Sequence, residues 1–88
     1  MPYVPEDQRK RFEPDLSKLK RKLELIYRPK GTLTYLVYSL GVSYFKGRES
    51  YTAMSDSISA LNDAAEEIRR RYLNPYEDEA IKRNGDVT

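Results

Sequence analysis

The chain contains no cysteine, no histidine and no tryptophan among its 88 residues. Without cysteine it can form neither a disulfide bond nor a thiolate metal site to stabilise a small fold. The lack of histidine and cysteine also removes the commonest catalytic base, the usual thiol nucleophile and the commonest metal ligand. We therefore expect a protein that is not an enzyme and that holds no cofactor and no metal ion.

The four glycines do not form a phosphate-binding loop, because Gly41 and Gly47 in GVSYFKG lack the Gly-Lys-Ser/Thr ending. Acidic neighbours such as Glu66 and Glu67 point apart on a helix, so we interpret them as solvated or salt-bridged. A magnesium site built from Asp and Glu alone is an alternative that no spacing in the sequence supports.

Long apolar segments are scarce as well. The longest run without a charged residue covers residues 31–45, GTLTYLVYSLGVSYF, between Lys30 and Lys46. A membrane-spanning helix needs roughly 20 residues, so this run is too short. The start, MPYVPEDQRKR, has no apolar core, and we expect no signal peptide. We interpret residues 31–45 as the central helix of a small soluble protein that has no membrane partner.

A chain of 88 residues makes one domain. Such a short chain buries only about 60–65% of its unfolded surface, so its own core is thin. We therefore expect self-association to supply the missing stabilisation, in a homo-oligomer. The expected organisation is an N-terminal arm at residues 1–13 and a single helical domain at residues 14–88.

The arm is predicted to be extended apart from one helical turn that starts at Pro5, since proline suits the first helical position. Tyr3, Val4 and Phe12 are its expected anchors. The first full helix is predicted from Pro14 to Arg28, where Pro29 ends it. Four apolar residues in it fall on one stripe: Leu16, Leu19, Leu23 and Ile26.

The central run also has strand-forming residues, so a β-hairpin is the alternative to a helix here. Helix is favoured by spacing, with Thr32 as its N-cap. The apolar residues recur at i, i+3, i+4, i+7 and i+11: Leu33, Leu36, Val37, Leu40 and Tyr44. Gly41 weakens such a helix by about 1 kcal/mol relative to alanine and can mark the close approach of a neighbouring helix.

The longest predicted helix runs from Ser50 to Leu73. It carries an a/d heptad pattern, which we call the heptad stripe and predict as the oligomer interface. The stripe consists of Tyr51, Met54, Ile58, Leu61, Ala65, Ile68 and Tyr72. A separate short helix is predicted from Asn74 to Arg83, with Asn74 as cap, Pro75 in the first turn and Glu77 in a capping box. Gly85 is expected to stop it in the left-handed conformation.

These elements predict an all-α fold: a small helical bundle with two shorter helices packed on one long helix, plus a short C-terminal helix. Charge is segregated along it, although the net charge is only +2. Residues 9–30 hold nine basic and three acidic residues, a balance of +6, and the charged residues of 49–67 are all acidic. The two regions can pack beside each other, or the basic one can bind a polyanion.

Eight tyrosines against two phenylalanines are unusual for a plain core. Tyrosine is favoured where one end of the ring is buried and the other is wet, as at interfaces, although packing at the rim of the core is the simpler explanation for any single one. The candidate residues for binding a ligand or anion are Arg9, Lys10, Arg11, Lys18, Arg21, Lys22, Tyr35, Tyr38, Arg69 and Arg70.

Three segments carry a resemblance to known proteins: MPYVPEDQRK, GTLTYLVYSL and RRRYLNPYEDEAIKRNGDV at residues 69–87. The chain resembles an uncharacterised family of small bacteriophage-encoded proteins, and the closing NPYEDxxIxxNGDV-like signature is the most specific part. The resemblance implies a phage origin and the host cytoplasm. It implies no activity and no functional residues.

Three functions remain open. The first is a phage-encoded, non-enzymatic protein of the host-modulating or anti-defence type, which binds a host protein or a small nucleotide signal stoichiometrically. The second is a nucleic-acid-binding accessory protein that uses the basic segment 9–30. The third is a structural or assembly component of the virion. A membrane-surface role for the first helix is disfavoured, because its apolar stripe is short.

Overall fold

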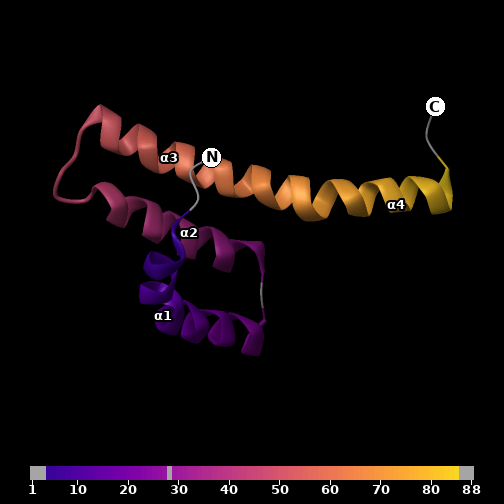
Figure 1. The fold of residues 1–88 in the computed structure, drawn as a ribbon, viewed down its shortest axis with the longest axis horizontal. Coiled ribbons are helices and arrows are strands. Elements are labelled where there is room, and N and C mark those ends of the chain that lie inside the picture. The colour runs from indigo at the N-terminus through magenta and orange to yellow at the C-terminus, as the bar shows by residue number, and fades with distance from the viewer. Residues whose placement is uncertain (1–3, 28, 86–88) are drawn as a thin grey trace. The chain divides into compact units, whose positions relative to one another are not determined.

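The computed structural model describes residues 4–27 and 29–85, and within these ranges it contains helices and no strand (Figure 1). The elements are α1 (Glu6–Leu25), α2 (Lys30–Phe45), α3 (Tyr51–Ile68), the π-helix η1 (Arg69–Leu73) and α4 (Asn74–Asn84). The all-α prediction is confirmed, and the β-hairpin alternative for residues 31–45 is wrong.

Helix α1 begins where the sequence predicted a single turn. Pro5 is its N-cap, with φ −58° and ψ 153°, and the Arg9 amide donates to the Pro5 carbonyl at 3.0 Å. The helix then continues through Pro14, so residues 6–13 are helical where an extended arm was expected. Because proline has no amide hydrogen, the Lys10 carbonyl lacks the backbone hydrogen bond that residue 14 would otherwise donate. Phe12 lies in this helix; the anchor role expected of Tyr3 falls outside the described residues.

The apolar spacing continues across Pro14. Phe12 precedes Leu16 by four residues, which extends the predicted stripe by one turn. The end of α1 also differs from the prediction, because Ile26 is already extended, with φ −118° and ψ 164°. Ile26 therefore lies after the helix, and the predicted end at Arg28 falls outside the described residues.

Helix α2 starts earlier than predicted. The Thr32 amide donates to the Pro29 carbonyl at 3.0 Å, so Thr32 lies within the first turn and is not the N-cap. Hydroxyl groups along the helix bond back to the preceding turn, from Thr34 to the Lys30 carbonyl at 3.0 Å and from Ser39 to the Tyr35 carbonyl at 2.9 Å. Such bonds satisfy polar side chains within a helix.

The turn after α2 leads into a well-capped α3. Gly47 has φ +86°, which glycine adopts without strain, and its amide donates to the Glu49 carboxylate at 3.1 Å. Ser50 caps α3 by accepting a hydrogen bond from the Ala53 amide at 3.0 Å. The predicted start of the long helix at Ser50 is thus confirmed.

The predicted break at Asn74 is wrong. Asn74 is helical, with φ −62° and ψ −46°, and its amide donates to the Arg69 carbonyl five residues back. In Figure 1, α3, η1 and α4 run as one helix from the salmon segment to the yellow one. Pro75 explains the π turn: its ring would clash with the Arg71 carbonyl in a regular α-helix, and a wider turn relieves that clash.

Gly85 ends α4 as predicted, and its amide donates to the Ile81 carbonyl at 2.7 Å. Its φ of +82° has the expected sign, whereas its ψ of 153° is extended and lies outside the left-handed helical region. Only glycine adopts this combination readily.

Contacts divide the chain into two compact units, Met1–Ser39 and Leu40–Thr88. Helix α1 and the first part of α2 belong to one unit, and the end of α2 belongs to the other with α3, η1 and α4. No hydrophobic side chain of the described residues is buried. The buried positions there are Gly41 and Ser57.

Candidate functional site

The end of α2 lies against α3 at Gly41, where side chains of α3 contact the α2 backbone. The Ser57 hydroxyl donates to the Gly41 carbonyl at 2.7 Å, and Ser57 is only 5% exposed. A Cβ atom built on Gly41 would lie 3.1 Å from Leu61 Cδ1 and 3.3 Å from Ser57 Oγ. Gly41 therefore marks the close approach of a neighbouring helix, as the sequence indicated.

This contact covers only one edge of the heptad stripe. Leu61 is half-buried beside Gly41, while Ile58 and Ile68 remain 61% and 60% exposed. Tyr51 and Tyr72, at the two ends of the stripe, are more exposed still. The predicted interface residues thus share one face of the long helix, and most of that face is accessible.

A shallow apolar hollow lies at the start of α3. Its lining residues are Tyr51, Met54, Ser55 and Ile58. They stand at positions i, i+3, i+4 and i+7, the four positions that form the hole for one side chain of a facing helix in a coiled coil. Ile58 follows Ser57 by about 100° around the helix, so the hollow is turned away from the Gly41 contact.

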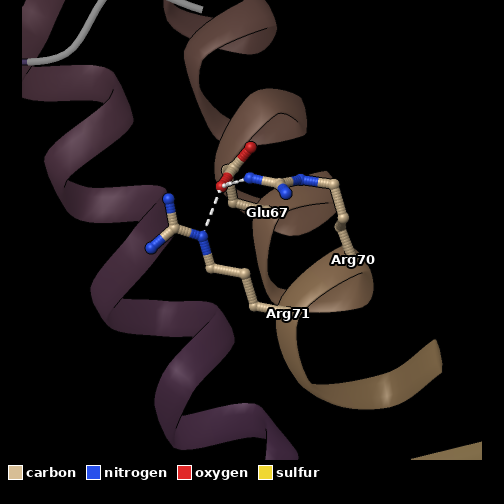
Figure 2. A network of polar contacts seen from close by, with 3 residues as sticks. All are labelled: Glu67, Arg70 and Arg71. Carbon is tan, nitrogen blue, oxygen red and sulfur yellow. Dashed lines mark hydrogen bonds and ion pairs between the residues drawn. The ribbon is translucent and has the colours of Figure 1, made fainter. Parts of the chain in front are cut away.

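The arginines of η1 are organised by acidic residues one turn earlier. Arg70 Nη2 and Arg71 Nε donate to the same Glu67 oxygen, at 2.9 and 2.7 Å (Figure 2). The hydrogen bond from Arg70, supported by Arg71, lowers the pKa of the Glu67 carboxyl below its ordinary value of 4.5. Arg69 Nε lies 3.5 Å from a Glu66 oxygen. Arg69 and Arg70, predicted to bind anions, thus already neutralise carboxylates of their own helix.

The predicted basic residues of α1 do not all share one side. Lys18, Arg21 and Lys22 stand at i, i+3 and i+4, and Arg11 lies two turns before Lys18 on the same side. We call these four residues the basic side of α1. Arg9, in contrast, precedes Lys18 by about 900° and lies opposite.

Lys10, the remaining candidate of α1, forms an exposed ion pair with Glu6 at 3.7 Å. It precedes Lys18 by about 800°, which places it at the margin of the basic side. Exposed ion pairs of this kind contribute little to stability, so Lys10 can leave Glu6 and bind another anion.

The tyrosines of α2 have different surroundings. Tyr35 and Tyr38 stand three residues apart and are both 67% exposed, so they form an accessible pair. Tyr44 is engaged by Arg48, whose guanidinium lies 4.9 Å from the centre of the ring. Arg48 Nε and Nη2 also donate to the Tyr44 carbonyl at 3.0 and 2.8 Å. They thereby supply hydrogen bonds to a backbone carbonyl in the last turn of α2.

Within residues 4–27 and 29–85, no group of three acidic, histidine or cysteine side chains is placed to hold a metal ion. No helix in the same ranges is both long and apolar enough to cross a membrane.

Sequence reasoning missed the π segment. Its interpretation of Glu66 and Glu67 as salt-bridged agrees with their ion pairs, but it did not name the arginine partners. The signal for Glu67 was available: it precedes Arg70 and Arg71 by three and four residues, the spacings at which helical side chains meet. The π segment has only Pro75 as a signal, and proline within an apolar pattern equally favours a helix end.

Comparisons with curated proteins and with solved structures found no match. A scan against protein families matched residues 1–87 to the family described as "Domain of unknown function (DUF6899)". Since this match covers nearly the whole sequence, the chain belongs to the DUF6899 family.

Proposed function

We propose that this chain is a phage-encoded, non-enzymatic protein that acts in the host cytoplasm by stoichiometric binding of a host protein or a small nucleotide signal. One observation carries the proposal: the described residues bury no hydrophobic side chain, while large apolar and aromatic side chains are exposed on every helix. Exposed apolar surface of this extent is typical of proteins that bind partners.

The accessible pair Tyr35 and Tyr38 is the best candidate for contact with that partner. Tyrosine rings supply apolar area together with a hydroxyl that hydrogen-bonds, and they are enriched at binding surfaces. For a nucleotide, the same rings stack on a base, and a guanidinium binds the phosphate. The pair lies in the first of the two compact units, away in sequence from the heptad stripe.

Affinity purification of the tagged full-length chain from infected host cells tests the proposal, with protein identification and small-molecule mass spectrometry on the eluate. We expect one protein or nucleotide at a fixed molar ratio to the chain. The double substitution Tyr35→Ala/Tyr38→Ala should lose it. Tyr27→Ala is the matched control, because Tyr27 is 88% exposed and lies between α1 and α2.

Two results would contradict the proposal. The first is an eluate in which no component reaches a fixed ratio to the chain. The second is a partner that the double variant binds as well as the Tyr27→Ala variant does.

Nucleic-acid binding is a second candidate, and the basic side of α1 favours it. Four cations on one side of a helix suit contact with a phosphate backbone. Affinity for DNA or RNA should then fall steeply with salt concentration, and Lys18→Glu should weaken it more than Arg9→Glu does. Equal effects of these two substitutions, or binding that does not respond to salt, would remove this candidate.

A further inference from the structure

The cations on the basic side of α1 are unpaired. Within residues 4–27 and 29–85, none of its four side chains has an ion-pair partner, and all four residues are exposed. The arginines of η1, in contrast, lie against glutamates of the preceding turn. The four available charges belong to Arg11, Lys18, Arg21 and Lys22.

These charges stand along one continuous helix, because α1 does not stop at Pro14. A helix that began at Pro14 would have left Arg11 in the arm, away from the other three. From Arg11 to Lys22 the helix is about 16 Å long. Duplex DNA carries one phosphate charge per about 1.7 Å of its axis, and each strand one per about 3.4 Å. Over the length of the basic side, a duplex therefore presents about ten charges, twice as many as one of its strands.

Two acidic residues lie beside these cations. Asp7 precedes Arg11 by four residues, and Asp15 precedes Lys18 by three, the spacings of neighbours on a helix. Four cations and two acids leave this side at +2. The other acidic residues of α1 lie about 120–140° around the helix from Lys18, so they do not reduce this balance further. They are Glu6, Glu13 and Glu24.

The basic side lacks an aromatic ring. Phe12 is the one aromatic residue of α1, and it lies about 120° around the helix from Lys18. The uncharged residues within the range of directions that the four cations cover are Pro14 and Leu25. Proteins that bind single-stranded nucleic acid stack its bases on aromatic side chains, and this side offers none. Its cations suit the outside of a duplex, where the phosphates are accessible and the bases are stacked on one another.

We propose that the basic side of α1 binds the phosphate backbone of duplex DNA, with each of its four cations against one phosphate and no base stacked on the protein. Such contacts release condensed counterions and carry no information on sequence, so binding depends on salt and tolerates any sequence. This inference rests on the second candidate function, nucleic-acid binding. It adds the class of nucleic acid and the residues that contact it.

Fluorescence anisotropy measures binding of the full-length chain to a labelled DNA duplex and to one of its strands alone. Four phosphate contacts predict a slope of about −3.6 for log K against log salt concentration, so affinity for the duplex should fall about 150-fold between about 50 and 200 mM salt. At the lower salt concentration the single strand should bind about tenfold more weakly, or less well still, because it offers half the charge and finds no ring to stack on.

A pair of substitutions assigns the contact to one side of the helix. Lys18→Gln removes one phosphate contact, so the slope should change to about −2.7 and affinity should fall only about 40-fold over the same range of salt. The matched control is Lys20→Gln, which removes the same charge but lies about 160° around the helix from Lys18, and it should keep the wild-type slope. Both lysines are exposed, so circular dichroism should show unchanged helix content in both variants.

The outcomes separate this inference from the function on which it rests. A single strand that binds as tightly as the duplex would overturn the inference and leave nucleic-acid binding standing. Equal salt slopes for Lys18→Gln and Lys20→Gln would overturn the assignment of the contact to the basic side. A chain that binds neither nucleic acid at about 50 mM salt, where electrostatic binding is strong, would overturn both the inference and the second candidate function.

Discussion

Replacement of Gly41 by valine should destabilise the fold through the contact between α2 and α3. The new Cβ atom would lie 3.1 Å from Leu61 Cδ1 and 3.3 Å from Ser57 Oγ, and two further methyl groups must fit around it. Overpacking of this kind costs about 1–3 kcal/mol. Valine recovers only about 0.3 kcal/mol of helix propensity relative to glycine. The expected net loss is about 0.7–2.7 kcal/mol.

Thermal unfolding followed by circular dichroism at one fixed protein concentration measures this loss. For a chain of this length, about 0.7–2.7 kcal/mol corresponds to a fall in Tm of roughly 3–20 °C. Gly31→Val is the matched control: it lies in the same helix, and a Cβ atom there meets nothing within 4 Å. If Gly41→Val unfolds at the temperature of Gly31→Val, the close contact at Gly41 does not hold the helices together and the reasoning fails.

Three further substitutions probe single interactions. Ser57→Ala removes the buried bond to the Gly41 carbonyl and should cost about 1 kcal/mol in chemical unfolding, while the exposed Ser59→Ala should change stability by less than about 0.5 kcal/mol. Ser50→Ala removes the N-cap of α3 and should cost about 1 kcal/mol in the same assay. The lowered pKa of Glu67 means that its ion pairs stabilise the folded chain above pH 4.5, the ordinary pKa, and that this stabilisation is lost as the pH falls through the lowered pKa. The Tm of Glu67→Gln should therefore depend less on acid pH than that of the wild type, and an identical pH dependence would contradict the assignment.

Local signals predicted most of the helical elements. Ser50 and Gly85 act as the sequence indicated, because a cap or a positive φ depends on the residue itself and its immediate neighbours. The heptad spacing of α3 is likewise a local property. The two prolines within helical patterns, Pro14 and Pro75, were interpreted as helix starts, and the chain instead continues through both.

These errors have one physical cause. A proline removes one backbone bond whether the helix stops or continues, and the outcome depends on what continuation gains. At Pro14 the helix continues and keeps Phe12 four residues before Leu16. At Pro75 it continues through a π turn, which makes room for the proline ring. Propensity applied one segment at a time favours a helix start at both prolines.

The candidate binding residues were predicted less well than the helices. Composition identified basic residues and tyrosines but not their surroundings. Glu67 engages Arg70 at 2.9 Å. The Arg48 guanidinium lies over the Tyr44 ring, which is 48% exposed, whereas Tyr35 is 67% exposed. Which cation or ring is accessible depends on pairs along the helix, and the i, i+3 and i+4 spacings of the sequence already indicate those pairs.

Helix α4 depends on its continuity with α3 through η1. Within the described residues, the 11 residues of α4 pack against no element other than η1. An isolated helix of this length is marginal in water, since about 12–15 residues are needed even for good helix formers. Continuity with α3 removes the cost of nucleating a new helix, but it leaves the Tyr76 ring exposed.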